Sequence, residues 1–172
     1  MKKIPVENLN KIKKATPRIE DRIKIKISFG NEFVTIKGSE VNEFLTEQII
    51  NAIDFGFNVE DALLLKRDGF IIEFIKVKEF TRRKNLKDVR ARIIGKDGKA
   101  RKTIENLTGA EIVIKDNTIG VIVDSEHLDS TIQGIELLIQ GSKHGNVFSY
   151  LEKQNVKRNQ LDDDDLGLKV DS

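Results

Sequence analysis

The amino-acid sequence predicts an α+β protein that consists of two related units. In both halves of the chain, strand-like alternation of apolar residues is followed by helix-like spacing. A shift of 86 positions aligns the second half with the first, which indicates an internal repeat. The aligned pairs are Ser39 and Ser125, Ile49 and Ile135, and Ile53 and Ile139. The length of 172 residues suits one domain or two small ones.

In the first half, apolar and polar residues alternate from Arg22 to Phe29, which is typical of a half-buried strand. Gly30 and Asn31 predict a turn, and residues 33–36 predict a second strand. Ser39 is a suitable N-cap for the helix that follows. The apolar stripe expected on this helix consists of Val41, Phe44, Leu45, Gln48, Ile49, Ala52 and Ile53.

A short extra helix is expected at residues 60–66, and Gly69 stops it from continuing. Residues 70–77 then predict a strand. Apolar spacing then predicts two further helices, at residues 86–93 and 100–107. These two helices lie on either side of a glycine-containing break.

The rest of the second half repeats the pattern of the first. Gly109 stands at a C′ position of the preceding helix. Residues 111–115 and 119–123 predict a strand pair joined by a turn. Ser125 is expected to cap the next helix. After Leu151 the chain becomes polar, so we expect a helix that gives way to a disordered tail.

Charge is concentrated in blocks, although the formal net charge of the chain is only +2. Residues 1–26 carry a net charge of +6, and residues 81–102 carry +8. Residues 38–65 carry −6 and contain no basic residue. Such asymmetry indicates that different surfaces meet different partners.

The residue types present exclude several kinds of chemistry. The chain has no cysteine, which removes disulfides, thiolate metal sites and thiol nucleophiles. Its only histidines are His127 and His144, so a histidine-rich metal site is excluded as well. No apolar run is long enough to span a membrane, and the N-terminus lacks the apolar region of a secretory signal. We therefore expect a soluble cytoplasmic protein without a cofactor or metal.

The clearest functional pattern is the stretch Gly95-Lys96-Asp97-Gly98, which separates a short helix from a basic one. Two glycines allow a tight turn and a close approach of a sugar–phosphate backbone. Loop amides and the start of the next helix both favour a phosphate. The P-loop pattern is absent, because Ala100 and Thr103 stand five positions after the two glycines. The plain alternative is a helix–helix turn on a solvated surface, in which Asp97 is an ordinary turn residue.

The order of helix, glycine loop, basic helix and strand pair resembles the KH (K-homology) RNA-binding module, whose GXXG loop clamps about four nucleotides. The resemblance implies two tandem type I KH-like domains, each with a three-stranded sheet and helices on one face. The first would be degenerate, since no glycine precedes Phe29. The implied boundaries are 1–66 for the first domain with its linker helix, 70–141 for the second, and 142–172 for a C-terminal helix with an acidic disordered tail.

The resemblance also implies which residues contact RNA. The loop would hold the RNA backbone, and the basic side chains near it would supply charge. Bases would lie over an apolar groove that Ile94, Ile112 and Ile114 line or support. The implied RNA-binding residues are Arg90, Arg92, Ile94, Gly95, Lys96, Asp97, Gly98, Lys99, Arg101 and Lys102. No catalytic or metal-binding residue is implied.

The linker helix and the segment at residues 141–148 extend the resemblance over residues 3–158. There the chain is similar to the archaeal KH-domain ribosome-biogenesis family, the counterpart of the eukaryotic "partner of Nob" family. This resemblance implies a non-enzymatic protein that binds single-stranded 16S rRNA, or its precursor, near the 3′ end. The implied partners are the endonuclease that matures this end and the alpha subunit of translation initiation factor two. We expect a monomer.

Several alternatives stay open from the sequence. The protein could act mainly as a docking adaptor for the nuclease or the initiation factor, with the acidic helix at residues 40–53 as the binding face or as a plain solvated surface. The basic N-terminal stretch either touches RNA or only braces the second unit. Asp162–Asp165 lacks the spaced ligands of a calcium loop, so we expect an acidic tail there. His127 is expected to be exposed, and His144 to shape a turn.

Overall fold

The computed structural model describes residues 1–165, with the side chains described through residue 161. The described chain separates into two compact units. One comprises residues 1–74 and 113–122, and the other comprises residues 75–112 and the part that follows residue 122. Two three-stranded sheets are present, with the strand orders β1-β3-β2 and β4-β6-β5. The predicted α+β class is therefore confirmed.

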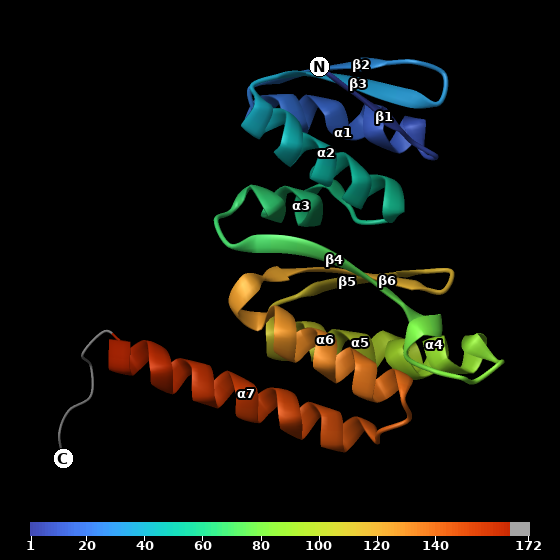
Figure 1. The fold of residues 1–172 in the computed structure, drawn as a ribbon, viewed down its shortest axis with the longest axis vertical. Coiled ribbons are helices and arrows are strands. Elements are labelled where there is room, and N and C mark those ends of the chain that lie inside the picture. Colours follow the sequence, from blue (N-terminus) through green and yellow to red (C-terminus); the bar gives the residue numbers. More distant parts are fainter. Residues whose placement is uncertain (166–172) are drawn as a thin grey trace. The chain divides into compact units, whose positions relative to one another are not determined.

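The N-terminal sheet is antiparallel, and β3 is its central strand. Helices α1 and α2 lie on the same side of this sheet (Figure 1). Ile4, Val34 and Ile36 are buried beneath them. The elements are β1 (Lys2–Pro5), α1 (Leu9–Arg22), β2 (Ile25–Phe29), β3 (Phe33–Gly38), α2 (Glu40–Phe55), α3 (Val59–Ala62) and η1 (Leu63–Lys66).

Strand β1 is an element that the sequence pattern does not predict. It has only four residues and ends in a proline, so it shows no clear alternation. It forms because β3 pairs with it, with Ile4 opposite Val34 in the register. Ile4 is buried, which adds an apolar contribution to the pairing.

The apolar stripe expected on α2 is correct at its C-terminal end and wrong at its start. Ile49 and Ile53 are buried, whereas Val41 is 76% exposed and Phe44 is 58% exposed. Glu43 takes the inward position instead. Its carboxylate accepts a hydrogen bond from the backbone N–H of Gly38 at 3.1 Å and lies 2.8 Å from the N-terminal amine. These two polar contacts orient the first turn of α2 and leave its apolar residues in solvent.

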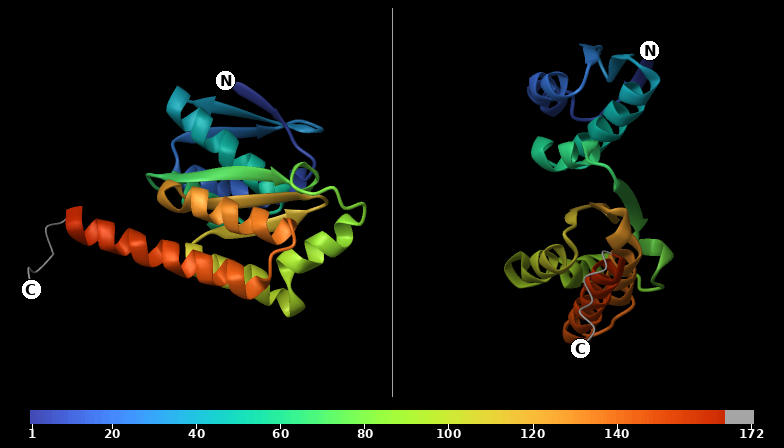
Figure 2. Two further views of the ribbon diagram at one scale, coloured as in Figure 1. Left: turned by 60° about the horizontal axis from the view of Figure 1, so that its bottom comes forward. Right: turned by 90° about the vertical axis from the view of Figure 1, so that its left-hand side faces the viewer.

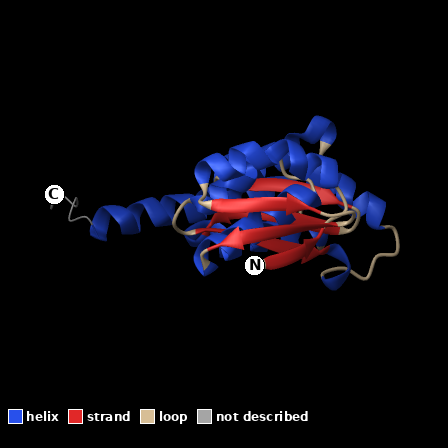
Figure 3. Ribbon diagram, turned by 90° about the horizontal axis from the view of Figure 1, so that it is seen from above, coloured by secondary structure: helices blue, strands red, loops and turns tan. Residues whose placement is uncertain are grey.

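The remaining elements follow the predicted order closely. Residues 80–85 form the longest connection, and the other loops, tan in Figure 3, are short. The elements are β4 (Phe70–Lys76), η2 (Val77–Glu79), α4 (Leu86–Ile94), η3 (Lys96–Gly98), α5 (Lys99–Thr108), β5 (Glu111–Lys115), β6 (Thr118–Asp124), α6 (Ser125–Ile139) and α7 (His144–Asp165).

Helix ends agree with the predicted caps except at one position. Ser39 caps α2 by accepting from the N–H of Asn42, and Gly109 ends α5 with φ +73°. Ser125, however, is the first residue of α6 and not its cap. The cap is Asp124, whose carboxylate accepts from the N–H of Glu126 at 3.0 Å.

Helix α7 is longer than the sequence suggests. It packs on α5 and α6 (Figure 2), with Val147 and Leu151 buried. The acidic run Asp162–Asp165, for which we expected disorder, falls within the last turn of this helix. Residues 166–172, the rest of the expected tail, lie outside the described residues.

The two halves share a strand order but differ between their first two strands. A single helix, α1, connects β1 to β2, whereas α4, the glycine loop and α5 connect β4 to β5. Within the glycine-free stretch at the start of the chain, Leu9–Arg22 thus forms one uninterrupted helix.

The contacts of Glu43 predict an acid-dependent contribution to stability. Two hydrogen bonds to the carboxylate of Glu43 lower its pKa below the ordinary value of 4.5. The N-terminal amine donates the one with the larger effect, and the backbone N–H of Gly38 donates the other. A carboxyl group with a lowered folded-state pKa stabilises the fold above its unfolded pKa and loses this effect as the pH falls through the folded value. We expect urea unfolding to show wild type more stable than Glu43→Gln at pH 7, with a smaller difference at pH 3. An equal difference at both pH values would contradict this account.

Candidate nucleic-acid interface

The glycine loop has a backbone conformation that requires its first glycine. Gly95 has φ +74° and Gly98 has φ +73°, both in the region that L side chains rarely adopt. A Cβ on Gly95 would lie 2.5 Å from the Cβ of Ala100 and 2.7 Å from its nitrogen, whereas one on Gly98 would meet nothing within 4 Å. The first glycine therefore lets α5 pack closely on the loop, and the second borders open space that a ligand can enter.

The three predicted lysines belong to this loop and to the first turn of the helix that follows it. Lys96, Lys99 and Lys102 are exposed, and none of them forms an ion pair with an acid in the described part of the chain. The first turn of α5 starts directly after Gly98, so its backbone N–H groups and the helix dipole add positive potential there. Asp97, at φ +56°, is the one acid of the loop.

Two of the predicted arginines make structural contacts. Arg92 donates to the backbone carbonyl of Ser142 at 2.6 Å, and the ring of His144 lies 2.7 Å from the carbonyl of Arg92. Arg101 donates to the carbonyl of Ile112 at 3.1 Å and lies 3.7 Å from the carboxylate of Glu105. These guanidinium groups tie α4 to the start of α7 and α5 to β5.

The other predicted residues differ in how accessible they are. Arg90 is half-buried, and Ile94 is 38% exposed beside the loop. Ile112 is buried, so it can support a base-binding surface but not line one. Ile114 is half-buried.

Both histidines have structural partners that lie far away in the sequence. His144 contacts the carbonyl of Arg92, so it fixes more than its own turn. His127 is half-buried and not simply exposed, because the guanidinium of Arg158 contacts its ring. No sequence spacing could have revealed these contacts.

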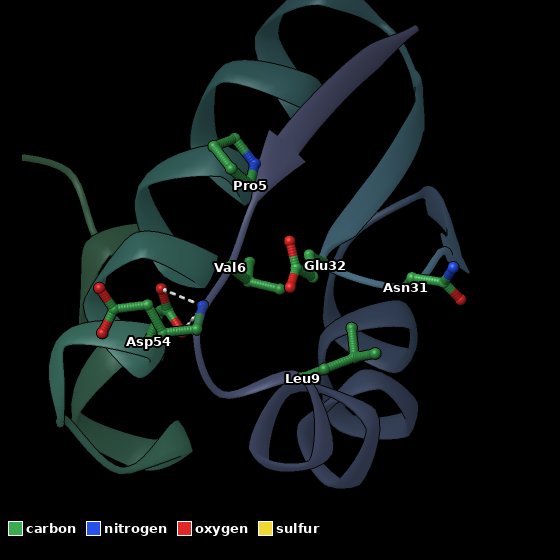
Figure 4. A pocket seen from close by; sticks show the side chains of 7 residues that line it. Pro5, Val6, Leu9, Asn31, Glu32 and Asp54 are labelled. Atoms are coloured by element: carbon green, nitrogen blue, oxygen red, sulfur yellow. Dashed lines mark hydrogen bonds between the residues drawn. The ribbon is translucent and has the colours of Figure 1, made fainter.

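The N-terminal unit contains a depression whose lining is acidic, unlike the basic surroundings of the glycine loop (Figure 4). Its volume is about 630 Å³, and it is lined by Pro5, Val6, Glu7, Leu9, Asn31, Glu32 and Asp54. Asp54 accepts backbone hydrogen bonds from Glu7 and Asn8, as the dashed lines at Asp54 show in part. An acidic lining without a cation disfavours a phosphate, so the glycine loop is the better candidate for nucleic acid.

Other kinds of site find little support in the residues that the structure describes. Among the side chains described, those of residues 1–161, no three acidic or imidazole groups lie together so that they could hold a metal ion. None of the described helices is both long and apolar enough to cross a membrane.

Comparison with known proteins identifies the fold around the loop. A family model described as a eukaryotic type KH-domain (KH-domain type I), that of the second KH domain of Pno1, matches residues 71–156. The chain belongs to the Pno1 family of KH-domain proteins. The KH fold predicted from the glycine loop is thereby confirmed for this segment, which contains α4, the loop, α5 and the hairpin.

Sequence similarity to individual proteins supports the same family assignment. The chain is 30% identical to a KH domain-containing protein of Methanocaldococcus jannaschii, over 81% of this chain and 64% of the relative. It is also 30% identical to the pre-rRNA-processing protein PNO1 of Debaryomyces hansenii, over 80% and 58%. The chain thus spans about three fifths of the length of these curated relatives.

A solved structure shows the same architecture. The chain is similar to one in the a/eIF2alpha–aDim2p–rRNA complex from Pyrococcus horikoshii OT3, with 27% identity and a TM-score of 0.79. The match covers 91% of this chain and 94% of that one.

The two glycines of this Pno1-family loop predict different costs of substitution. Gly98→Ala places a side chain on a backbone with positive φ but causes no clash, so it should lower the free energy of unfolding by about 1 kcal/mol. Gly95→Ala adds a clash with Ala100 and should cost about 2 kcal/mol more, the typical cost of overpacking. Chemical denaturation of both variants measures this difference, and equal costs would contradict the loop geometry.

The contact of Arg92 predicts that it stabilises the fold. Arg92→Ala removes a charged hydrogen bond to Ser142 and should lower the free energy of unfolding by about 1.5–3 kcal/mol. Lys102→Ala, on the exposed face of α5, should change it by less than about 0.5 kcal/mol. Thermal unfolding compares the two variants, and a neutral Arg92→Ala would exclude a structural role.

Proposed function

We propose that this chain is a non-catalytic RNA-binding protein of small ribosomal subunit biogenesis. It clamps single-stranded 16S rRNA, or its precursor, near the 3′ end through Gly95–Gly98. The observation that carries the proposal is the glycine loop itself, within a Pno1-type KH domain. Gly98 borders open space, exposed lysines stand at residues 96 and 99, and α5 begins directly after it.

The proposed mechanism is electrostatic positioning of the RNA backbone. A phosphate approaches Gly98, where no Cβ blocks it and the first N–H groups of α5 favour an anion. Lys96 and Lys99 provide mobile charge on either side of this position, and Lys102 extends it along α5. Arg92 and Arg101 shape the site through their backbone contacts and contribute a longer-range positive field.

The proposal includes a second, degenerate KH-like unit at the N-terminus. In this view residues 1–66 and 70–141 are tandem type I KH-like domains, followed by a C-terminal segment at 142–172. The shared strand order of the two sheets supports the relation. The single helix α1, in place of two helices and a loop, explains why the first unit has no clamp.

The names of the relatives support the choice of RNA and cellular process. The PNO1 proteins are described as pre-rRNA-processing proteins, and the P. horikoshii relative forms a complex with rRNA and a/eIF2alpha. We extend these properties to this chain as part of the proposal. The maturing endonuclease, the cytoplasmic location and the monomeric state belong to the same proposal and rest on the family resemblance.

A specific surface favours a second candidate function, that of a docking adaptor. Val41 and Phe44 are exposed on α2, within the acidic block of the chain. Exposed apolar residues with acidic neighbours suit a protein partner better than RNA. The alpha subunit of an initiation factor is the candidate partner, and its capture after RNase treatment would distinguish this function from the first.

Fluorescence anisotropy with a single-stranded RNA matching the 3′ end of the small-subunit rRNA tests the clamp. Lys96→Asp should weaken binding and reduce the slope of log affinity against log salt by about 0.7, the value for one phosphate contact with a single strand. Lys66→Asp makes the same charge change at the exposed end of η1 and should bind like wild type. Equal binding by all three proteins would refute the clamp.

A further inference from the structure

The glycine loop stands at one end of α5, and the two sides of this helix differ. On one side, Arg101 and Glu105 contact the backbone of Ile112 in β5. This is the side on which the resemblance places the base-binding groove. On the other side, Lys99 and Thr103 lie one helical turn apart and face α7.

An open surface depression of about 240 Å³ lies on this second side, and we call it the α7 pocket. Its walls are mainly apolar, although it opens next to two lysines. It is lined by Gly95, Lys96, Lys99, Ala100, Thr103, His144 and Phe148. The pocket is therefore continuous with the loop to which the phosphate is assigned.

Two aromatic rings in the lining are held in place. The rings of His144 and Phe148 lie 6.0 Å apart at 51°. The carbonyl of Arg92 can only accept a hydrogen bond, so the Nε2 of His144, 2.7 Å away, must donate to it. In the neutral ring, Nδ1 is then an acceptor.

Besides the two lysine ammonium groups, which can only donate, the lining contains two side chains that can accept a hydrogen bond. Thr103 donates its hydroxyl proton to the carbonyl of Lys99 at 2.8 Å, which leaves the lone pairs of its oxygen for a ligand. Together with Nδ1 of His144, these atoms suit a planar group that carries an N–H donor. The two lysines at the opening suit an anion attached to that group.

We propose that the α7 pocket is a nucleobase subsite. It takes one unpaired base of the strand whose phosphate lies on the glycine loop, with the base against Phe148. This inference rests on the proposed RNA clamp and adds a second base-contacting surface, on the side of α5 away from β5.

The test uses single-stranded RNAs of the small-subunit 3′ end, each with 2-aminopurine at one position. Binding should change the fluorescence strongly at one position, because the base stacks on Phe148. Phe148→Leu keeps an apolar side chain but removes the ring, so it should abolish this change and weaken binding about fivefold or more. Stacking of a base is worth about 1–3 kcal/mol. Tyr150→Leu removes a ring from the same helix outside the lining and should bind like wild type.

The outcomes separate the pocket from the clamp. If Phe148→Leu behaves like wild type while Lys96→Asp binds weakly, the pocket is not a base subsite and the clamp stands. If Lys96→Asp also behaves like wild type, the clamp itself fails. Loss of initiation-factor binding by Phe148→Leu, with RNA binding intact, would assign the pocket to a protein and overturn the inference.

A measurement on the unsubstituted protein guards against a variant that fails to fold. Ultraviolet cross-linking of wild type to the same RNA should join a base to the peptide that contains His144 and Phe148. Cross-links found only in other peptides would overturn the inference.

Discussion

The close approach of Ala100 to Gly95 is the contact on which the candidate site depends. A Cβ at Gly95 would overlap Ala100, so only glycine allows α5 to begin immediately after the turn. Because α5 begins there, its N–H groups and its first lysine lie next to the open space at Gly98. The same residue thus sets both the fold of the loop and the position of its charge.

A set of backbone contacts then holds this loop against α7. Arg92 reaches the carbonyl of Ser142, and His144 reaches back to the carbonyl of Arg92. Such reciprocal contacts fix the last turn of α4 and the first turn of α7 relative to each other. They also use the guanidinium of Arg92, which a charge count assigns to ligand binding, so fewer cations are free for a ligand than the sequence suggests. The exposed lysines carry the part of the positive charge that is free to move.

Local patterns were enough to predict most of the fold. The glycine loop, the strand pair at residues 111–123, the start of α2 and the end of α5 follow from periodicity and capping, which depend on neighbouring residues. Strand β1 was missed because it forms only by pairing with β3. Val41 and Phe44 were placed inside because the polar contacts of Glu43 that turn α2 come from distant positions.

The glycine loop of the site could be predicted from the sequence, whereas the contacts that surround the loop could not. The spacing of Gly95 and Gly98 identified the loop, since that geometry is local. The structural roles of Arg92 and Arg101 depend on carbonyls in other elements, and Phe148 reaches the loop only because α7 packs on α5. No spacing rule connects residue 148 to residue 95, so the sequence alone gave no signal for the α7 pocket.

The central claim is that RNA contacts this protein at the glycine loop. Titration of isotope-labelled protein with single-stranded RNA of the small-subunit 3′ end, followed by amide chemical shifts, tests it directly. The largest shifts are expected at residues 95–99 and in the rest of the first turn of α5. Shifts that are absent there and occur only along α2 would contradict it and assign the interaction to another surface.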